Sequence, residues 1–290
     1  MILNKLHVNM SKCCFMHYKP SKYSATSEEI CDPDLKLGID GFAIKQCNQT
    51  RFLGVIIDEK LNWDAHIKYL KRKLNYSMST LYRIMDGIPK ELHRNLYYTL
   101  FESHLSYCIS VWGGATKYRI QSLWTTQKRC IRILFGNREA YREKFNTCAR
   151  TRPINQQILD NEFYIPEHTK PLFESYKILS VQNLYTYHCF METYKILKFR
   201  QPMSLYDKFK ISERKPTLLI AGLPSQKFTD RTTYIWNSIT PKLKLVDLSP
   251  KVSSMKSIIK KAIFQNQHAE LPLEWTSENF DPTKICCTTK

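Results

Sequence analysis

The chain has 290 residues and a formal net charge of +18. Its 43% hydrophobic and 12% aromatic residues are enough to form a folded core, so we do not expect a wholly disordered protein. Only 8 residues are glycine, and neither a Walker A nor a dinucleotide-binding glycine pattern occurs, which argues against folds built on glycine-rich phosphate turns. No apolar run approaches the roughly 20 residues that cross a bilayer, and no secretory leader pattern is present, so we expect an intracellular protein, nuclear or cytoplasmic, that is not secreted.

The first 60 residues are expected to form a small antiparallel sheet. Residues 8–18 have the pattern of an extended segment, and residues 52–57 have that of an apolar strand. Between them, Asp40-Gly41 with apolar flanks predicts a β-hairpin, because glycine readily adopts the positive φ of a tight turn.

From residue 62 the apolar residues recur every three or four positions, which is the spacing of one helix face. A long helix is expected to begin near Asn62 or Asp64 and to end at Gly87-Ile88-Pro89. A second helix is expected over 90–112, and a third ends at Gly136. Their apolar stripes are typical of the core of a helix bundle.

The remaining residues are less regular and are expected to form a mainly helical C-terminal region. Its expected parts are a linker at 150–153, a helix over 175–198, a loop over 200–230, a short helix over 232–238 and a last helix after Ser249-Pro250. The patterns together predict an α+β fold that is mainly α.

Positive charge is concentrated in the middle of the chain. Residues 61–150 hold 16 basic against 6 acidic side chains, a net +10 of the total +18. This concentration favours a polyanionic partner, either nucleic acid or an anionic membrane face, although a solvated helical surface explains the charge alone equally well. The cations beside the apolar stripes of the expected helices are Lys68, Lys71, Arg72, Lys73, Lys128, Arg129 and Arg132.

No catalytic or metal-binding constellation can be recognised in the sequence. Two-metal nucleotidyl transfer requires clustered carboxylates, and no two aspartates are adjacent anywhere in the chain. We expect Asp32, Asp34 and the Asp58-Glu59 pair to lie in turns or at the start of a helix and not to bind a metal. The prediction is therefore that this chain contains no catalytic residue, no metal ligand and no cofactor.

Five short strings carry a resemblance to a known family. They are Asn9-Met10-Ser11-Lys12, residues 52–67 from Phe52-Leu53-Gly54 to His66-Ile67, residues 107–113, residues 127–133, and Arg231 with Ile235-Trp236-Asn237-Ser238-Ile239. They resemble non-LTR retrotransposon reverse transcriptases of the jockey and related LINE types. The likeness extends over nearly the whole chain and is weaker after residue 140.

The resemblance implies three parts. Residues 1–61 correspond to the end of the polymerase palm, residues 62–149 to a basic thumb-like helix bundle, and residues 150–290 to a C-terminal helical region. The thumb of the family holds an RNA·DNA hybrid through phosphate contacts that do not depend on sequence.

The resemblance also implies roles for individual residues. Lys12 corresponds to a family lysine near the incoming triphosphate, although the residue after it is Cys13 where the family has threonine. Phe52, Leu53 and Gly54 correspond to the hairpin that holds the primer end against the active site.

The catalytic part of the family is not found in this chain. The Tyr/Phe-x-Asp-Asp palm strand, the fingers and the endonuclease domain precede the matching part in the family. Magnesium is implied only for the complete enzyme, because without those carboxylates nothing holds the cations. We therefore expect an inactive fragment of an RNA-directed DNA polymerase that at most binds RNA·DNA hybrid, element RNA or other nucleic acid. The sequence does not indicate an oligomeric state.

Two alternatives stay open. The chain could be a non-enzymatic basic helical protein that binds an acidic partner or an anionic membrane surface. Alternatively, the isolated thumb does not fold stably, because the palm that would cover its apolar face is absent.

Overall fold

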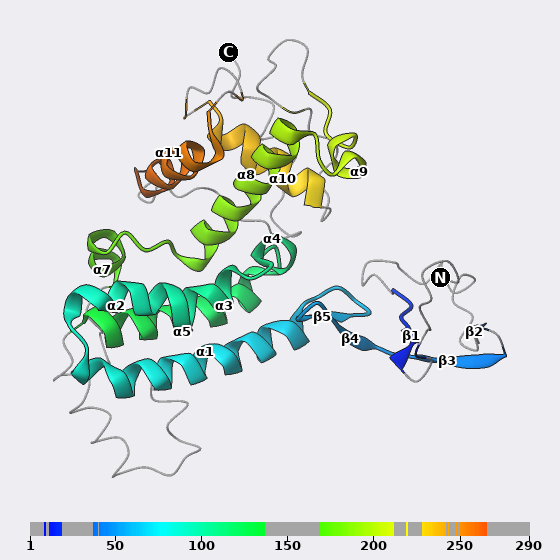
Figure 1. The fold of residues 1–290 in the computed structure, drawn as a ribbon, viewed down its shortest axis with the longest axis horizontal. Helices are drawn as coiled ribbons and strands as arrows, with labels where there is room; N and C mark the ends of the chain where they lie inside the picture. Colours follow the sequence, from blue (N-terminus) through cyan, green and yellow to red (C-terminus); the bar gives the residue numbers. More distant parts are fainter. Residues whose placement is uncertain are drawn as a thin grey trace. The chain divides into compact units, whose positions relative to one another are not determined.

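The computed structural model describes residues 9, 12–18, 37–39, 41–136, 169–211, 219, 228–241, 243, 248 and 250–265. The chain forms two compact units, residues 1–69 and residues 70–290. The named strands lie in the first unit and most helices in the second, so the expected α+β class, mainly α, is confirmed (Figure 1). The expected division after residues 61 and 149 stays a prediction. Asp32, Asp34, Asp40, Ser249 and the expected linker at 150–153 lie outside the described residues.

The first sheet has the strand order β1-β3-β2. Strands β2 (Leu37–Ile39) and β3 (Phe42–Gln46) pair antiparallel across a tight turn in which Gly41 has a φ of +80°, which confirms the expected hairpin. Strand β1 (Cys14–Phe15) pairs parallel with β3, so the expectation of a wholly antiparallel sheet was wrong. No short turn joins β1 to β3, and antiparallel pairing is therefore not enforced.

A second hairpin follows directly. Strands β4 (Gln49–Phe52) and β5 (Val55–Asp58) pair antiparallel, and their turn consists of Leu53 and Gly54 with φ values of 45° and 84°. Two consecutive positive φ values are typical of a primed turn. The expected strand over 52–57 was therefore wrong at its start, because Phe52 to Gly54 reverse the chain before Val55.

The Asp58 carboxylate organises the loop after β5. Its Oδ1 accepts hydrogen bonds from the backbone N–H groups of Lys60 and Asn62, both at 3.1 Å, and its Oδ2 accepts from that of Trp63 at 2.9 Å. Helix α1 (Asp64–Ile84) begins immediately afterwards, as expected. Asp58 is therefore a turn residue, as its position at the end of a strand suggested.

Replacing Asp58 with alanine is expected to loosen this loop. Three backbone N–H groups would lose their acceptor, and hydrogen exchange at Lys60, Asn62 and Trp63 should accelerate by about tenfold or more. Amide exchange measured by NMR tests this expectation. The control is Glu59→Ala, which removes the neighbouring carboxylate; equal exchange rates in the two variants would contradict the role of Asp58.

The apolar stripe of α1 is buried, as the spacing predicted. Within the second unit, Leu70, Leu74, Leu81 and Met85 are each at most 4% exposed. A short 3-10 helix, η4 (Met85–Gly87), ends the long helix at the expected place.

The expected single helix over 90–112 is interrupted, so this prediction was wrong. It comprises α2 (Lys90–Leu96), the π-helical η5 (Tyr97–Glu102), α3 (Ser103–Ser106) and α4 (Ile109–Trp112). Cys108 has a φ of +51°, a left-handed conformation that breaks an α-helix. The Trp112 indole N–H donates to the Tyr107 carbonyl at 2.9 Å and so satisfies the acceptor that the break exposes.

Helix α5 (Lys117–Phe135) ends before Gly136, as expected. Its buried face includes the amide side chain of Gln127 besides apolar residues. The Gln127 amide donates to the Tyr97 hydroxyl at 2.8 Å and to the Leu179 carbonyl at 2.9 Å, and its oxygen accepts from the Val181 N–H at 2.9 Å. One residue of α5 thus joins η5 to the segment that leads into α8.

The expected helix over 175–198 begins later than its pattern indicated. Helix α7 (Lys170–Ser175) is followed by a non-helical segment in which Ile178 and Leu179 are buried, and α8 (Val181–Phe199) starts only after Ser180. The Ser180 hydroxyl accepts from the Asn183 N–H at 3.2 Å and caps α8. Ile178 and Leu179 are therefore buried although they do not belong to a helix.

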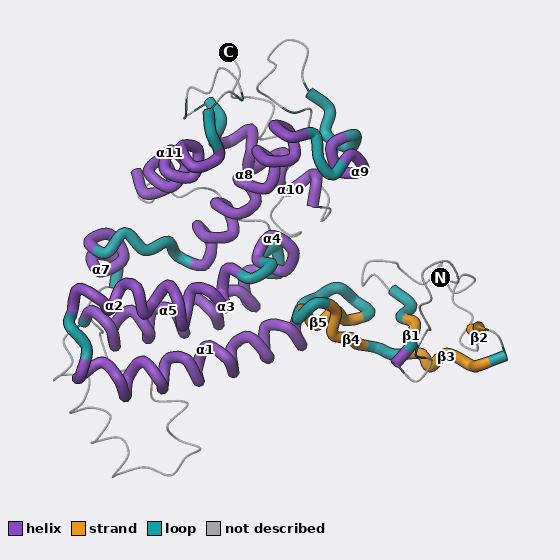
Figure 2. The backbone as a smooth tube through the Cα atoms, in the orientation of Figure 1, coloured by secondary structure: helices purple, strands orange, loops and turns teal. Residues whose placement is uncertain are grey.

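Helix α8 is the centre of the second unit. It contacts α3, α4, α5, α9, α10 and α11, and Figure 2 shows these helices around it. The last helices are α9 (Met203–Tyr206), α10 (Phe228–Ile239) and α11 (Val252–Gln265). The helix expected over 232–238 is thus longer than predicted, and the last helix lies where it was expected.

Candidate nucleic-acid interface

The turn between β4 and β5 presents apolar side chains to solvent. Phe52 is 62% exposed and Leu53 is 74% exposed. Adjacent exposed apolar side chains offer apolar surface that a partner can cover. The sequence singled out these residues and Gly54, and the structure places all three at one turn.

Other cations of the first unit lie near its strands or on the first turns of α1. Lys12 and Lys68 are both exposed. The guanidinium of Arg51 donates to the Tyr69 hydroxyl at 3.2 Å and lies 5.3 Å from the centre of its ring. Arg51 was not singled out from the sequence, because its aromatic partner lies on a different element.

Helix α1 carries the second group of predicted cations. Lys71, Arg72 and Lys73 are exposed on its part within the second unit. Lys73 lies close enough to His104 of α3 to lower the pKa of that histidine, although burial is the larger cause. Lys73 is thus on the side of α1 that faces α3.

An exposed tyrosine extends the surface around Arg72. Tyr76 is 74% exposed and lies one turn after Arg72, and Arg83 follows on the same face with its guanidinium 3.2 Å from the Ser79 hydroxyl. Arginine and tyrosine can together contact phosphates and stack on bases. The signal for Tyr76 was present in the sequence as a lone aromatic residue on the polar side of an amphipathic helix.

The predicted cations of α5 differ in their environments. Arg129 is exposed, whereas Lys128 and Arg132 are half-buried. The Lys128 ammonium lies 5.4 Å from the centre of the Trp124 ring, and burial, followed by repulsion from Arg132, lowers the pKa of Lys128. Lys128 and Arg132 are therefore close together, one helical turn apart, as the spacing predicted.

Several residues of the family-like strings have structural contacts. Asp58 accepts hydrogen bonds in the loop before α1. His66 is 3% exposed and accepts a hydrogen bond from the Ile56 N–H at 3.3 Å, and burial lowers its pKa. Asn237 makes two hydrogen bonds to the backbone of Leu219, at 2.7 and 3.0 Å. These contacts position the helices, and the cations project from the surfaces so formed.

The described ranges offer neither a metal centre nor a membrane span. Within them, no three His, Cys, Asp or Glu side chains come together as they would around a metal ion. No helix in these ranges combines the length and the apolar character needed to cross a bilayer. The exposed cations can make charge-assisted hydrogen bonds to anionic oxygens, and the exposed Phe52, Leu53 and Tyr76 can make apolar or stacking contacts.

Comparisons with known proteins give one distant similarity. No protein-family model matches the chain, and no solved structure matches it. Over 127 residues, 43% of the chain, it is 25% identical to the "Retrovirus-related Pol polyprotein from type-1 retrotransposable element R1" of Bradysia coprophila. The match spans 12% of the length of that polyprotein. The similarity supports a retrotransposon-related origin for this chain.

Proposed function

We propose that the chain is a nucleic-acid-binding part of the RNA-directed DNA polymerase of a non-LTR, LINE-type retrotransposon. It comprises the end of the palm, a thumb-like bundle and a C-terminal helical region, and it binds an RNA·DNA hybrid through backbone phosphates. The observation that carries the proposal is the exposure of cations on the helices that the resemblance assigns to the thumb, on α1 and on α5.

The same exposure accounts for the expected lack of sequence specificity. Lys71, Arg72 and Arg129 project from helical surfaces and can reach phosphate oxygens. Tyr76 adds an aromatic ring beside Arg72. In the first unit, the exposed Phe52-Leu53 turn supplies apolar contact to the primer end, and Lys12 contributes charge near the triphosphate of a complete polymerase.

This chain by itself is proposed not to polymerise DNA. Polymerases of this kind hold two divalent cations between aspartates, and the sequence contains no adjacent pair of aspartates. Magnesium therefore belongs to the proposal only for a complete enzyme, and the function of this chain is to hold nucleic acid.

Binding to a fluorescein-labelled RNA·DNA hybrid should weaken steeply between about 50 and 200 mM salt, because bound cations release counterions from the phosphates. Replacing Lys128, Arg129 and Arg132 together with glutamine should reduce the slope of log Kd against log salt by up to about 3. Fluorescence anisotropy measures both. The control removes three exposed lysines elsewhere, Lys208, Lys210 and Lys251, and should leave the slope nearly unchanged.

Three outcomes would contradict the proposal. Equal slopes in the α5 variant and in the lysine control would show that α5 does not contact phosphates. Stronger competition by anionic vesicles than by unlabelled hybrid would favour a membrane-binding protein. Nucleotide incorporation by the wild-type chain with magnesium would overturn the claim that it is inactive.

A further inference from the structure

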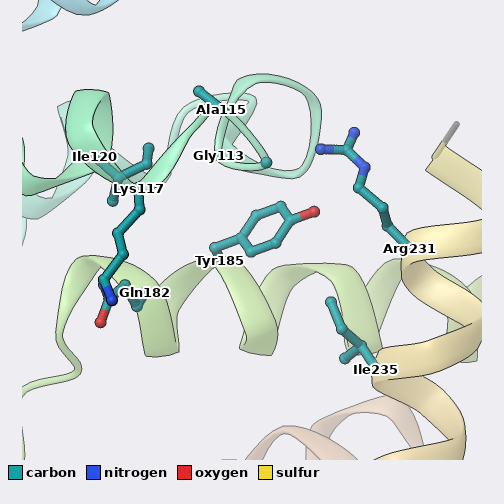
Figure 3. A pocket seen from close by; sticks show the side chains of 9 residues that line it. Gly113, Ala115, Lys117, Ile120, Gln182, Tyr185, Arg231 and Ile235 are labelled. Carbon is teal, nitrogen blue, oxygen red and sulfur yellow. The ribbon is translucent and has the colours of Figure 1, made fainter. Parts of the chain in front are cut away.

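A cavity of about 60 Å³ lies in the second unit, between the connection from α4 to α5, the start of α5, α8 and α10 (Figure 3). Its lining residues are Gly113, Gly114, Ala115, Lys117, Ile120, Gln182, Tyr185, Arg231 and Ile235. A single water molecule needs only about 10 to 15 Å³ of such space, so the cavity has room for a group of several heavy atoms.

Arg231 of α10 is the main polar group of this cavity. Figure 3 shows its guanidinium directed toward the loop of Gly113 and Ala115, above the ring of Tyr185. The guanidinium carbon lies 5.9 Å from the centre of that ring. Arg231 Nε is buried and has no hydrogen-bond partner within the described part of the chain. A buried guanidinium N–H without an acceptor is unfavourable, and an anionic oxygen would satisfy it.

The glycines of the loop leave room for the guanidinium. A Cβ added at Gly114 would lie 1.3 Å from Arg231 Nη1, and one added at Gly113 would lie 2.5 Å from the ring of Tyr185. A side chain at either position would displace Arg231 or Tyr185. Gly114 therefore permits a close approach of the Arg231 head group to the backbone, and Gly113 leaves room for the Tyr185 ring.

The charge of the cavity favours an anion. Lys117 supplies a second cation, and its side chain runs toward Gln182 in Figure 3. None of the nine lining residues is acidic. Ile120 and Ile235 form apolar walls, which reduce the local dielectric constant and strengthen attraction between Arg231 and an anion.

We propose that this cavity binds one phosphodiester group of a nucleic-acid backbone, with the Arg231 guanidinium as the principal donor and the Tyr185 hydroxyl and Lys117 beside it. The proposal rests on the proposed function and adds to it a defined phosphate site made by α5, α8 and α10. A guanidinium has a planar fork of donors that matches two oxygens of one phosphate.

The direct test uses dimethyl phosphate, which is a phosphodiester without sugar or base. In the ¹⁵N-labelled full chain, the side-chain Nε–H resonance of Arg231, assigned by its absence in Arg231→Lys, should shift saturably as dimethyl phosphate is added. The Nε–H resonance of the exposed Arg200, assigned in the same way, serves as the control and should not saturate. Sodium acetate and sodium chloride at the same ionic strength show whether the shift requires a phosphodiester.

A second test measures hybrid binding. Arg231→Gln should reduce the slope of log Kd against log salt by about 1, and Gly114→Ala should weaken binding by displacing the guanidinium. Lys208→Gln is the charge-matched control. Melting temperatures identify any variant that does not fold. If Arg231→Gln does not fold, the smaller change Arg231→Lys is tested in its place.

The outcomes separate this proposal from the general one. Wild-type binding with a steep salt dependence that Arg231→Gln leaves intact, together with no saturable shift at Arg231, would overturn the phosphate site and leave the proposed function standing. Absence of hybrid binding by the wild-type chain would overturn the proposed function, and the dimethyl phosphate titration would still decide whether the cavity binds a phosphodiester.

Discussion

Replacing Gln127 with leucine is expected to lower the free energy of unfolding of the second unit by about 3 kcal/mol or more. The side chain is completely buried and its amide makes three hydrogen bonds, to Tyr97, Leu179 and Val181. Leucine has a similar size but leaves a hydroxyl, a carbonyl and an N–H without their partner. Each buried group left unpaired costs about 1 to 3 kcal/mol, and the apolar side chain offsets part of the loss.

Urea denaturation followed by far-ultraviolet circular dichroism measures this effect, because most helices belong to the second unit. The matched control is Gln121→Leu, the same substitution at an exposed position of the same helix. It should change the free energy of unfolding by no more than about 0.5 kcal/mol. A loss below about 1 kcal/mol for Gln127→Leu would mean that the three hydrogen bonds contribute little to stability.

The stability of wild-type protein relative to Glu102→Gln is expected to fall as the pH rises from 5 to 8. Glu102 lies in η5, and its Oε2 is buried without a hydrogen-bond partner among the described residues. Burial raises the pKa of Glu102 from 4.5 to about 7, while the positive charges of Lys260 and Arg94 oppose this rise. The folded protein therefore holds the proton at pH values where the unfolded chain has released it.

The direction and size of this pH dependence follow from the difference between the pKa of Glu102 in the folded protein and in the unfolded chain. A carboxyl with a raised pKa contributes stability that is fully present below about pH 4.5 and is lost as the pH rises through about 7. At about 1.4 kcal/mol for each tenfold change, the upper limit of the loss is roughly 3 kcal/mol. Glutamine cannot ionise, so Glu102→Gln should be more stable than wild type at pH 8 and nearly equal to it at pH 5.

Urea denaturation of both proteins at several pH values checks this prediction. Comparing them at the same pH cancels the contribution of other titrating groups, such as His66 and His188, whose pKa values burial lowers. A difference between the two proteins that does not change with pH would contradict ionisation of a buried Glu102.

Local patterns in the sequence were sufficient for several elements. The spacing of Leu70, Leu74 and Leu81 predicted the buried face of α1, because one amphipathic helix buries whatever lies along its stripe. Gly41 and its flanks predicted the turn between β2 and β3, because few residues other than glycine adopt a positive φ without strain.

Local patterns failed where distant contacts decide the backbone. Cys108 breaks the helix between α3 and α4 with a positive φ, and a cysteine gives no sequence signal for it. The segment around Ile178 and Leu179 has apolar residues at helical spacing but is not helical, since Gln127 of α5 binds the backbone of Leu179 and Val181 there. Tertiary hydrogen bonds replace those that a helix would have made.

The exposure of several predicted cations followed from the sequence pattern, whereas the contacts around them did not. Basic side chains beside an apolar stripe must lie at a helix surface, so the exposure of Lys71, Arg72 and Arg129 could be expected from periodicity alone. The contact of Lys128 with Trp124 joins residues one turn apart on α5, but the packing of the Trp124 ring against Phe173 of α7 was not predictable.

The sequence by itself determined the class of fold, the long helices, the tight glycine turn and the positions of the exposed cations, because these follow from local periodicity and backbone sterics. Only the tertiary structure decided that Gln127 is a buried hydrogen-bonding centre, that Glu102 Oε2 is buried in a π-helix without a partner among the described residues, and that Arg231 reaches the loop of Gly113 and Gly114. Each of these depends on the packing of residues far apart in the chain, and no local pattern encodes which of them will meet.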